Sequence, residues 1–300
     1  MERKVYIDGK LYPESEAKIS VFDHGFLYGD GVFEGIRVYN GLIFRLAEHL
    51  NRLYESAHTV LLKIPMTRKQ LEQSIVKTLQ ANGQKDAYIR LVVSRGVGDL
   101  GLDPSKCKVA TVVIITNSIT LYPEKLYVDG LQIITVPTVR NIPEALNPQL
   151  KTLNYLNNIL AKIEAKNSGF VEALMLNHQG YVAECTGDNI FMVKKGMALT
   201  PPVYVGALPG ITRGAIIDLI QKPGLVKTPG LPKKFEERML TRHDLYNADE
   251  IFLTGTAAEV IPVVEIDGRT IGEGKPGPVT RQLIKGFHEL TRKDGVRYAM

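Results

Sequence analysis

The sequence predicts an α+β fold in two parts. Two patterns alternate along the 300 residues. One is an apolar repeat at three- and four-residue spacing, typical of amphipathic helices, and the other is a short run of β-branched residues, typical of strands. The hydrophobic content of 44% suits one large core or two modest ones. We expect two domains, 1–118 and 129–300, joined by a polar, turn-prone connection at 119–128.

The first half contains both patterns. Residues 3–12 alternate in character around an Asp-Gly pair, which predicts a β-hairpin. Residues 24–41 contain too many glycines for a stable helix, so we expect loop and strand there. Two amphipathic helices follow, around 44–62 and 71–79. Runs of β-branched residues then predict two strands, at 88–93 and 109–115.

The second half predicts a mixed sheet with a few helices. An apolar run at 131–139 opens it, and a helix follows the segment 147–152. One face of that helix is apolar, and we expect it to pack against a core: Leu153, Leu156, Ile159, Leu160 and Ile163. Short strands are expected at 171–177, 180–184, 189–200, 250–256 and 259–268, with helices at 211–220 and 278–292.

Charge and cysteine content exclude several classes of protein. The chain has 37 basic and 32 acidic residues without a basic block, which gives nucleic-acid binding little support. Cys107 and Cys185 are far apart in sequence and near no histidine pattern, so we expect neither a disulfide framework nor a metal site. The charged N-terminus and the lack of a long apolar run predict a cytoplasmic protein with no membrane segment.

Lys151 is the candidate catalytic residue. A lysine just before a helix is usually a solvated charge. It becomes a nucleophile when partial desolvation or a cationic neighbour lowers its pKa, and it then forms a Schiff base with an aldehyde such as pyridoxal phosphate. That cofactor needs a carboxylate for its ring nitrogen, and backbone donors and a cation for its phosphate.

The rest of the chain offers candidates for each of these needs. Glu184 ends a predicted strand just before a turn and is our candidate for the ring nitrogen. Ile211 and Thr212 begin a predicted helix, where backbone N–H groups lack partners. The small-residue turn at 254–259 offers further donors, and Arg52 offers positive charge. Each signal alone is also consistent with an ordinary strand end or helix start.

Taken together and in order, these motifs resemble those of the branched-chain aminotransferases, which are fold-type IV pyridoxal phosphate enzymes. The resemblance runs from about residue 3 to residue 290 and rests on HGFLYGDGVFEGIR, FRLAEHLNRL, AYIRLVVSRG, KTLNYLNNILAK, GYVAECTGDNIF, LPGITR and GTAAEVIPVVEIDGR. It implies a small α/β domain, a larger pseudo-barrel domain and an active site between them. It also implies a homodimer or a dimer-based hexamer in which a loop of the partner closes the site.

The resemblance also implies a role for individual residues. Lys151 matches the Schiff-base lysine, which shuttles the proton between the substrate α-carbon and the cofactor. The matching cofactor contacts are Arg52, Tyr155, Glu184, Gly187, Asn189, Ile211, Thr212 and Thr256. The matching substrate contacts are Tyr28, Phe33, Arg37, Tyr88, Arg90, Tyr122, Thr256 and Ala257. Cys185 stands where the family often has a small residue, which affects only the packing beside Glu184.

The implied reaction is transamination of leucine, isoleucine or valine with 2-oxoglutarate, by a ping-pong mechanism with pyridoxal 5'-phosphate as cofactor. Related enzymes share the same lysine, glutamate and phosphate site, so three alternatives stay open: a D-amino-acid aminotransferase, an R-selective amine transaminase and an aminodeoxychorismate lyase. A catalytically silent, metabolite-binding assembly on the same fold is the alternative from another class. The combination of YGDGVFEGIR with GTAAEV favours the branched-chain enzyme.

Overall fold

The computed structural model describes residues 2–222, 224–232 and 234–299, which form two compact units. The first unit contains the chain up to Ile119, the segment Leu150–Asn154 and the chain from Thr291 onward. The second unit contains Thr120–Gln149 and Tyr155–Leu290. The chain thus passes between the units at four places, and Lys151 belongs to the first unit. The domain limits 1–118 and 129–300 stay a prediction.

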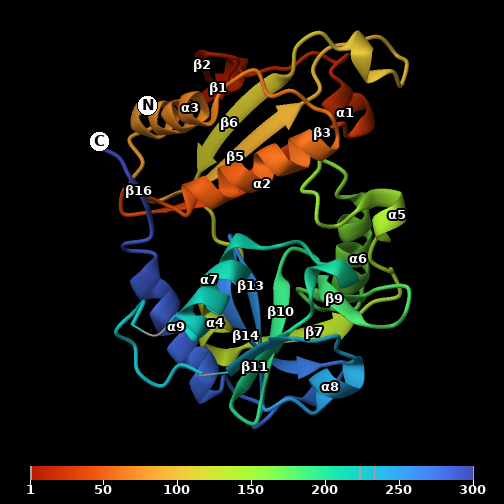
Figure 1. Cartoon of the computed structure of the whole chain (residues 1–300), viewed down its shortest axis with the longest axis vertical. Coiled ribbons are helices and arrows are strands. Elements are labelled where there is room, and N and C mark those ends of the chain that lie inside the picture. Colours follow the sequence, from red (N-terminus) through yellow and green to blue (C-terminus); the bar gives the residue numbers. More distant parts are fainter. Residues whose placement is uncertain (1, 223, 233, 300) are drawn as a thin grey trace. The chain divides into compact units, whose positions relative to one another are not determined.

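In the described part of the first unit, seven strands form one antiparallel sheet in the order β16-β4-β3-β5-β6-β1-β2 (Figure 1). The hairpin expected at 3–12 is confirmed. Asp8 and Gly9 join its strands with φ values of 45° and 92°, as a two-residue hairpin turn requires. The strands are β1 (Lys4–Ile7), β2 (Lys10–Pro13), β3 (Gly31–Tyr39), β4 (Leu42–Phe44), β5 (Ala87–Ser94), β6 (Thr111–Asn117) and β16 (Gly295–Arg297).

Two helices expected from their apolar period cover this sheet. Helix α2 (Leu46–Thr59) lies across β3, and α3 (Arg68–Ala81) packs against β1 and β6 (Figure 1). Thr67 caps α3 in a capping box with Gln70, which satisfies backbone donors at the helix start. Single turns of 3-10 helix, η1 (Glu14–Glu16) and η2 (Pro104–Lys106), lie in the loops.

For residues 24–41 we expected only loop and strand, which was wrong for the first five residues of the segment. Residues His24–Tyr28 form a short helix, α1, before β3 begins at Gly31. Asp23 caps the helix by accepting a hydrogen bond from the Gly25 N–H at 2.8 Å, and Gly29 ends it in the left-handed conformation. Both glycines thus lie at the ends of the helix, where their low helix propensity costs little.

The second unit contains a mixed sheet, as expected. In its described part the strand order is β12-β11-β10-β13-β14-β7-β8-β9, with β15 paired to β14. The pairs β11·β12, β14·β7 and β7·β8 are parallel. The strands are β7 (Leu131–Thr135), β8 (Ala173–Leu176), β9 (Val182–Cys185), β10 (Asn189–Lys194), β11 (Met197–Thr200), β12 (Lys234–Glu237), β13 (Glu250–Gly255), β14 (Glu259–Ile266) and β15 (Arg269–Thr270).

Helices α7 (Ile211–Gln221) and α9 (Pro278–Leu290), both expected from the sequence, lie side by side and pack on β13 (Figure 1). The sequence patterns did not predict four shorter elements: α4 (Glu124–Asp129), α5 (Pro143–Leu146), α8 (Arg242–Tyr246) and the turn η3 (Val203–Val205). None of the described helices is long and apolar enough to cross a membrane. Within the described ranges, no group of three or more His, Cys, Asp or Glu residues is placed to hold a metal ion.

The packing expected for the helix after Lys151 was wrong. Helix α6 begins only at Leu156 and ends at Asn167. Its buried residues are Asn158, Ala161 and Ala165, which are small or polar. The apolar stripe is exposed instead: Leu156 by 66%, Ile159 by 51%, Leu160 by 47% and Ile163 by 48%. The period identified an apolar face correctly, but a period does not say what covers that face.

Candidate active site

Lys151 is held by the edge of the first unit's sheet and not by a helix. Its carbonyl accepts a hydrogen bond from the Phe33 N–H at 3.0 Å, and the Leu153 N–H donates to the Gly31 carbonyl at 2.9 Å. Its own N–H donates to Ser56 Oγ on α2 at 3.2 Å. These contacts fix the backbone on both sides of the lysine. Its amine lies 4.4 Å from the centre of the Phe33 ring.

Four of the predicted substrate residues gather on one face of β3 and β5. The register pairs Arg37 with Tyr88 and places Arg90 opposite Gly35, so their side chains share the face of Phe33. The Arg90 guanidinium lies 4.7 Å from the centre of the Phe33 ring and donates to Tyr88 Oη at 3.2 Å. The first unit therefore presents an amine, two guanidinium groups and two aromatic rings together.

Gly35 is required for this arrangement. A Cβ atom at Gly35 would lie 1.9 Å from Tyr88 Oη. Among the described residues, no contact joins Tyr28 to the group of Phe33, Tyr88 and Arg90. It lies on α1, is 38% exposed, and donates to the Leu100 carbonyl at 2.6 Å.

Behind β3, Arg52 is anchored by a carboxylate that the sequence patterns did not reveal. Glu34 is fully buried and accepts from Arg52 Nε and Nη2, both at 2.8 Å, while its Oε2 lies 2.7 Å from His49 Nδ1. Burial alone would raise the pKa of Glu34, but the charge of Arg52, the electrostatic attraction of the His49 ring and the hydrogen bonds from both lower it to about 2. Burial also lowers the pKa of His49, against the opposing effect of Glu34. His49 is thus neutral near pH 7, and the Arg52 guanidinium balances the charge of Glu34.

This carboxylate could have been found from the sequence. Glu34 alternates with Val32 and Ile36, which are both fully buried. An acid at a core position of a strand requires a buried cation. His49 and Arg52 lie three residues apart on one side of a predicted helix, so the partners were visible in the sequence.

In the second unit, Glu184 lies near the end of β9, one residue before its last residue Cys185, and its carboxylate accepts hydrogen bonds at both oxygens. Its Oε1 accepts from Arg140 Nε at 3.0 Å and Nη2 at 2.9 Å. Its Oε2 accepts from Asn189 Nδ2 at 3.1 Å and from the Leu208 N–H at 2.9 Å. Arg140 and its further partner Asn158, whose Oδ1 lies 3.3 Å from Arg140 Nη1, were not identified from the sequence. Nothing in the pattern around Arg140 distinguishes it from a surface arginine.

The predicted phosphate donors lie close to this carboxylate. Helix α7 begins at Ile211 with Gly210 as its N-cap, and no side chain caps its first turn. A Cβ at Gly210 would lie 2.1 Å from Asn189 Oδ1, so glycine is needed where the helix start meets Asn189. Thr212 is buried in that first turn.

A second group of donors lies at the turn after β13, which contains Thr256 and Ala257. The turn lies beside Asn189, because Asn189 pairs with Thr254. The hydroxyl of Thr254 is buried without a hydrogen-bond partner among the described residues. Uncapped backbone donors and an unpaired hydroxyl fit the needs of an anionic group such as a phosphate.

Three further predicted residues lie in the second unit. Tyr155 is the N-cap residue of α6 and is partly buried. Gly187 is exposed in the turn between β9 and β10, where a Cβ would meet no atom within 4 Å. Tyr122 is only 3% exposed, and its hydroxyl contacts Glu172 and Asp188. The roles of these residues toward cofactor or substrate stay predictions.

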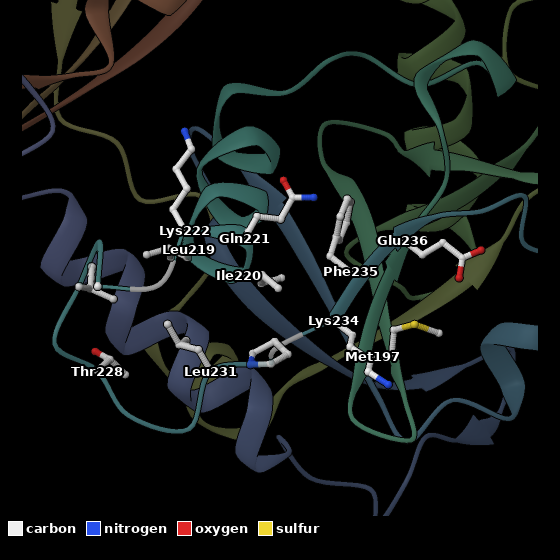
Figure 2. A pocket seen from close by; sticks show the side chains of 13 residues that line it. Met197, Leu219, Ile220, Gln221, Lys222, Thr228, Leu231, Lys234, Phe235 and Glu236 are labelled. Carbon is white, nitrogen blue, oxygen red and sulfur yellow. The ribbon is translucent and has the colours of Figure 1, made fainter.

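Two cavities lie away from these residues. The larger, of about 920 Å³, lies in the second unit, and Ile220, Leu231 and Phe235 are among its lining residues (Figure 2). The Lys222 amine and the Glu236 carboxylate point away from these apolar side chains in Figure 2. The smaller, of about 620 Å³, lies in the first unit beside Arg95 and Cys107. Neither cavity is lined by a predicted site residue of the described chain.

The chain matches a known family over most of its length. The model of the amino-transferase class IV family matches residues 31–266. The chain is 50% identical over 295 residues to a Methanocaldococcus jannaschii protein whose name assigns it to the branched-chain-amino-acid aminotransferases, with 98% of each chain covered. It is 35% identical over 286 residues to the D-alanine aminotransferase of Bacillus licheniformis, covering 93% of this chain and 94% of that one.

A solved structure resembles the whole chain. It is the branched-chain amino acid aminotransferase of Escherichia coli, with a TM-score of 0.90 and 33% identity over 96% of this chain and 94% of that one. The α+β class expected from the sequence, of fold-type IV, is thereby confirmed. The chain belongs to the class IV aminotransferases.

Proposed function

We propose that this chain transfers the amino group of leucine, isoleucine or valine to 2-oxoglutarate by a ping-pong mechanism. Its family membership supports an aminotransferase, and the branched-chain name of the relative at 50% identity supports this substrate class. The observation that carries the proposal is the placement of the Lys151 amine beside Phe33 and Arg90 on one face of the first unit.

That face suits both kinds of substrate. Phe33 and Tyr88 offer apolar surface to a branched side chain. Arg37 and Arg90 offer guanidinium groups, which bind carboxylates in a planar, two-pronged manner and therefore suit the γ-carboxylate of 2-oxoglutarate. A ping-pong enzyme must accept both side chains in turn, and a face with apolar and cationic parts meets that need.

Class IV aminotransferases depend on pyridoxal phosphate, and the residues of this chain fit it. When bound, that cofactor supplies an aldehyde for a lysine and a ring that withdraws electrons from the substrate. In our proposal Glu184 holds the ring nitrogen, and Tyr155 donates to the phenolic oxygen. The phosphate would be held by Arg52, Ile211, Thr212 and Thr256. The ring would be contacted by Gly187 and Asn189.

Lys151 is the catalytic residue of the proposal. Its amine takes the proton from the substrate α-carbon as general base and would then deliver it to the cofactor as general acid. The three backbone hydrogen bonds around it hold the point from which its side chain extends. The amides of Thr256 and Ala257 are proposed to bind the substrate α-carboxylate.

We also propose that the chain assembles into a homodimer or a dimer-based hexamer. The exposed stripe of Leu156, Ile159, Leu160 and Ile163 supports this, because four apolar side chains along one helix face are costly to leave in water. A cytoplasmic location stays a prediction.

The test adds L-leucine and D-alanine separately to purified protein that carries pyridoxal phosphate, and follows the visible absorbance of the bound cofactor. We expect L-leucine to remove that absorbance quickly and D-alanine to leave it nearly unchanged. 2-Oxoglutarate should then restore the absorbance, as a ping-pong mechanism requires. The reverse preference would favour a D-amino-acid aminotransferase, the function named for the Bacillus licheniformis relative.

Two variants sharpen this test. Lys151→Ala should abolish conversion of either amino acid. Lys10→Ala, an exposed residue of β2, should leave the rates as they are. A protein that does not acquire visible absorbance with added pyridoxal phosphate would contradict the whole proposal and favour a catalytically silent assembly.

A further inference from the structure

A single hydroxyl lies between two buried carboxyl groups in the second unit. Tyr122 Oη is 3.0 Å from Glu172 Oε2 and 3.2 Å from Asp188 Oδ2. All three side chains are buried, with exposures of 3%, 1% and 4%. A phenol has one proton to donate. Two such contacts therefore need a second proton, which must lie on one of the two carboxyl groups.

Glu172 is not the group that carries this proton. Its Oε1 accepts from the Ala173 N–H at 2.8 Å and from both the N–H and the hydroxyl of Thr186, at 2.9 and 2.5 Å. Its Oε2 accepts from Lys162 Nζ at 2.9 Å as well as from Tyr122. A carboxylate that accepts from five donors, one of them a cation, is stabilised as an anion.

Asp188 has the opposite surroundings. Among the described residues its carboxyl group makes a side-chain hydrogen bond only with Tyr122. Burial and then the charge of Glu172 raise the pKa of Asp188 to about 7, and Glu184 acts in the same direction, while the Tyr122 hydroxyl and Lys162 oppose them. The neighbouring Cys185 is also buried, and burial raises the pKa of its thiol, so it adds no charge.

Asp188 and Glu172 also lie next to residues that we propose for binding the cofactor. Asp188 stands between Glu184 and Asn189 in the chain, and a Cβ at Gly255 would lie 1.9 Å from its Oδ1. On the other side, the Glu172 carboxylate fixes Thr186 through two hydrogen bonds. The carboxyl pair thus ties the turn between β9 and β10 to Glu172 and Tyr122, and Asp188 lies against Gly255 at the end of β13.

We propose that Asp188 carries a proton in the folded protein and donates it in a hydrogen bond to Tyr122, which in turn donates to Glu172. In this arrangement Asp188, Tyr122 and Glu172 are positioning residues for the turn that presents Glu184 and Asn189. The proposed effect on the cofactor rests on the proposed function of those two residues. Ionisation of Asp188 places a second buried negative charge beside Glu172, so the turn loosens as the pH rises through neutrality.

The first experiment detects the proton without any cofactor or activity. Infrared spectra of the protein should show, at pH 6, the carbonyl stretch of a protonated carboxylic acid above the amide band. Asp188→Asn should remove that band, while Asp129→Asn, an exposed residue of α4, should retain it. In the unmodified protein the band should fade between pH 6 and pH 8.5. Absence of any Asp188-dependent band at pH 6 would overturn the proposal.

The second experiment tests the positioning role. Protein loaded with pyridoxal phosphate is dialysed at pH 6 and at pH 8.5, and the retained cofactor is measured. We expect retention in the unmodified protein to weaken roughly tenfold at the higher pH, the effect of losing one charged hydrogen bond. Asp188→Asn should show little pH dependence, because its amide still donates to Tyr122 and cannot ionise.

A third variant keeps the result interpretable. Tyr122→Phe removes the bridging hydroxyl and should weaken retention at both pH values. The same pH dependence in Asp188→Asn as in the unmodified protein would contradict the positioning role. If the protein does not bind the cofactor at all, the proposed function fails but the infrared result stands, so the two failures are distinguishable.

Discussion

At the scale of single residues, the buried Glu34 makes the free energy of unfolding depend on pH in the acidic range. Its pKa of about 2 lies below the ordinary value of 4.5, so its contribution is present above pH 4.5 and is lost as the pH falls toward 2. His49 acts in the same direction, because its lowered pKa means that the folded state resists its protonation. The first unit should therefore lose stability as the pH falls below about 6.

Glu34→Gln tests this dependence. At pH 7 we expect the variant to lose roughly 3 kcal/mol of unfolding free energy, because the Arg52 guanidinium is left buried without its counter-charge. Between pH 5 and pH 3 its stability should change less than that of the unmodified protein. Urea unfolding at pH 7, 5 and 3 measures both effects. Glu14→Gln, which removes an exposed partner of Arg3, is the control and should change stability by less than about 1 kcal/mol.

At the scale of elements, the short ladder between β3 and the segment around Lys151 depends on Gly31. A Cβ there would lie 2.6 Å from Leu153 Cδ1 and 2.7 Å from the Val93 carbonyl oxygen, and the backbone oxygen cannot move away cheaply. We expect Gly31→Ala to separate the Lys151 segment from β3 and to lower the rate of amino transfer from leucine at least about tenfold.

The measurement is the leucine half-reaction, with circular dichroism to confirm that the sheet persists. Gly286→Ala is the matched control, because its nearest neighbours would be 3.5 Å away and alanine favours the interior of α9. An unchanged leucine rate in Gly31→Ala would show that the ladder does not position Lys151.

Much of the element order was predictable from the sequence, because most of these segments carry a clear period. The hairpin at 3–12, helices α2, α3, α7 and α9, and strands β5, β6, β8, β9, β13 and β14 follow from alternation, β-branched content or helical spacing. The segment 189–200, expected as one strand, is instead the hairpin of β10 and β11, because Lys195 and Gly196 turn the chain with positive φ values. Helix α1 was missed because its cap residue Asp23 and terminating Gly29 outweigh the poor propensity of a five-residue segment.

The candidate site was predictable only where residues sit in motifs. Lys151, Glu184 and Thr212 were identified as candidates from their positions beside predicted helices and strands, and the family resemblance then gave them roles, whereas Arg140 and Glu34 were not identified. These two residues act through partners that are distant in sequence: Arg140 contacts Glu184 across 44 residues. Local patterns hold little information on the Arg140–Glu184 pair, because Arg140 alone resembles a surface charge. Glu34 differs, because its alternation with the buried Val32 and Ile36 marks it as an acid at a core position.

At the scale of the whole molecule, the exposed stripe on α6 bears on assembly. Leu156, Ile159, Leu160 and Ile163 follow the spacing i, i+3, i+4, i+7 and so form a continuous apolar row on one face. A two-fold interface uses the same patch on both subunits, so one row would meet another like it. A stable interface buries roughly 1,600 Å² in total, and the row would form its apolar centre.

The double variant Ile159→Lys and Ile163→Lys tests this assignment. In a two-fold interface it would bury four like charges near one another, a cost of several kcal/mol that the dimer cannot offset. We expect light scattering after size-exclusion chromatography to give a smaller mass for the variant than for the unmodified protein at equal concentration. Val128→Lys replaces another exposed apolar residue, 74% exposed on α4, and should leave the mass unchanged. Equal masses for the unmodified protein and the double variant would mean that α6 faces solvent in the assembly, and the subunit contact would then have to be sought on another surface.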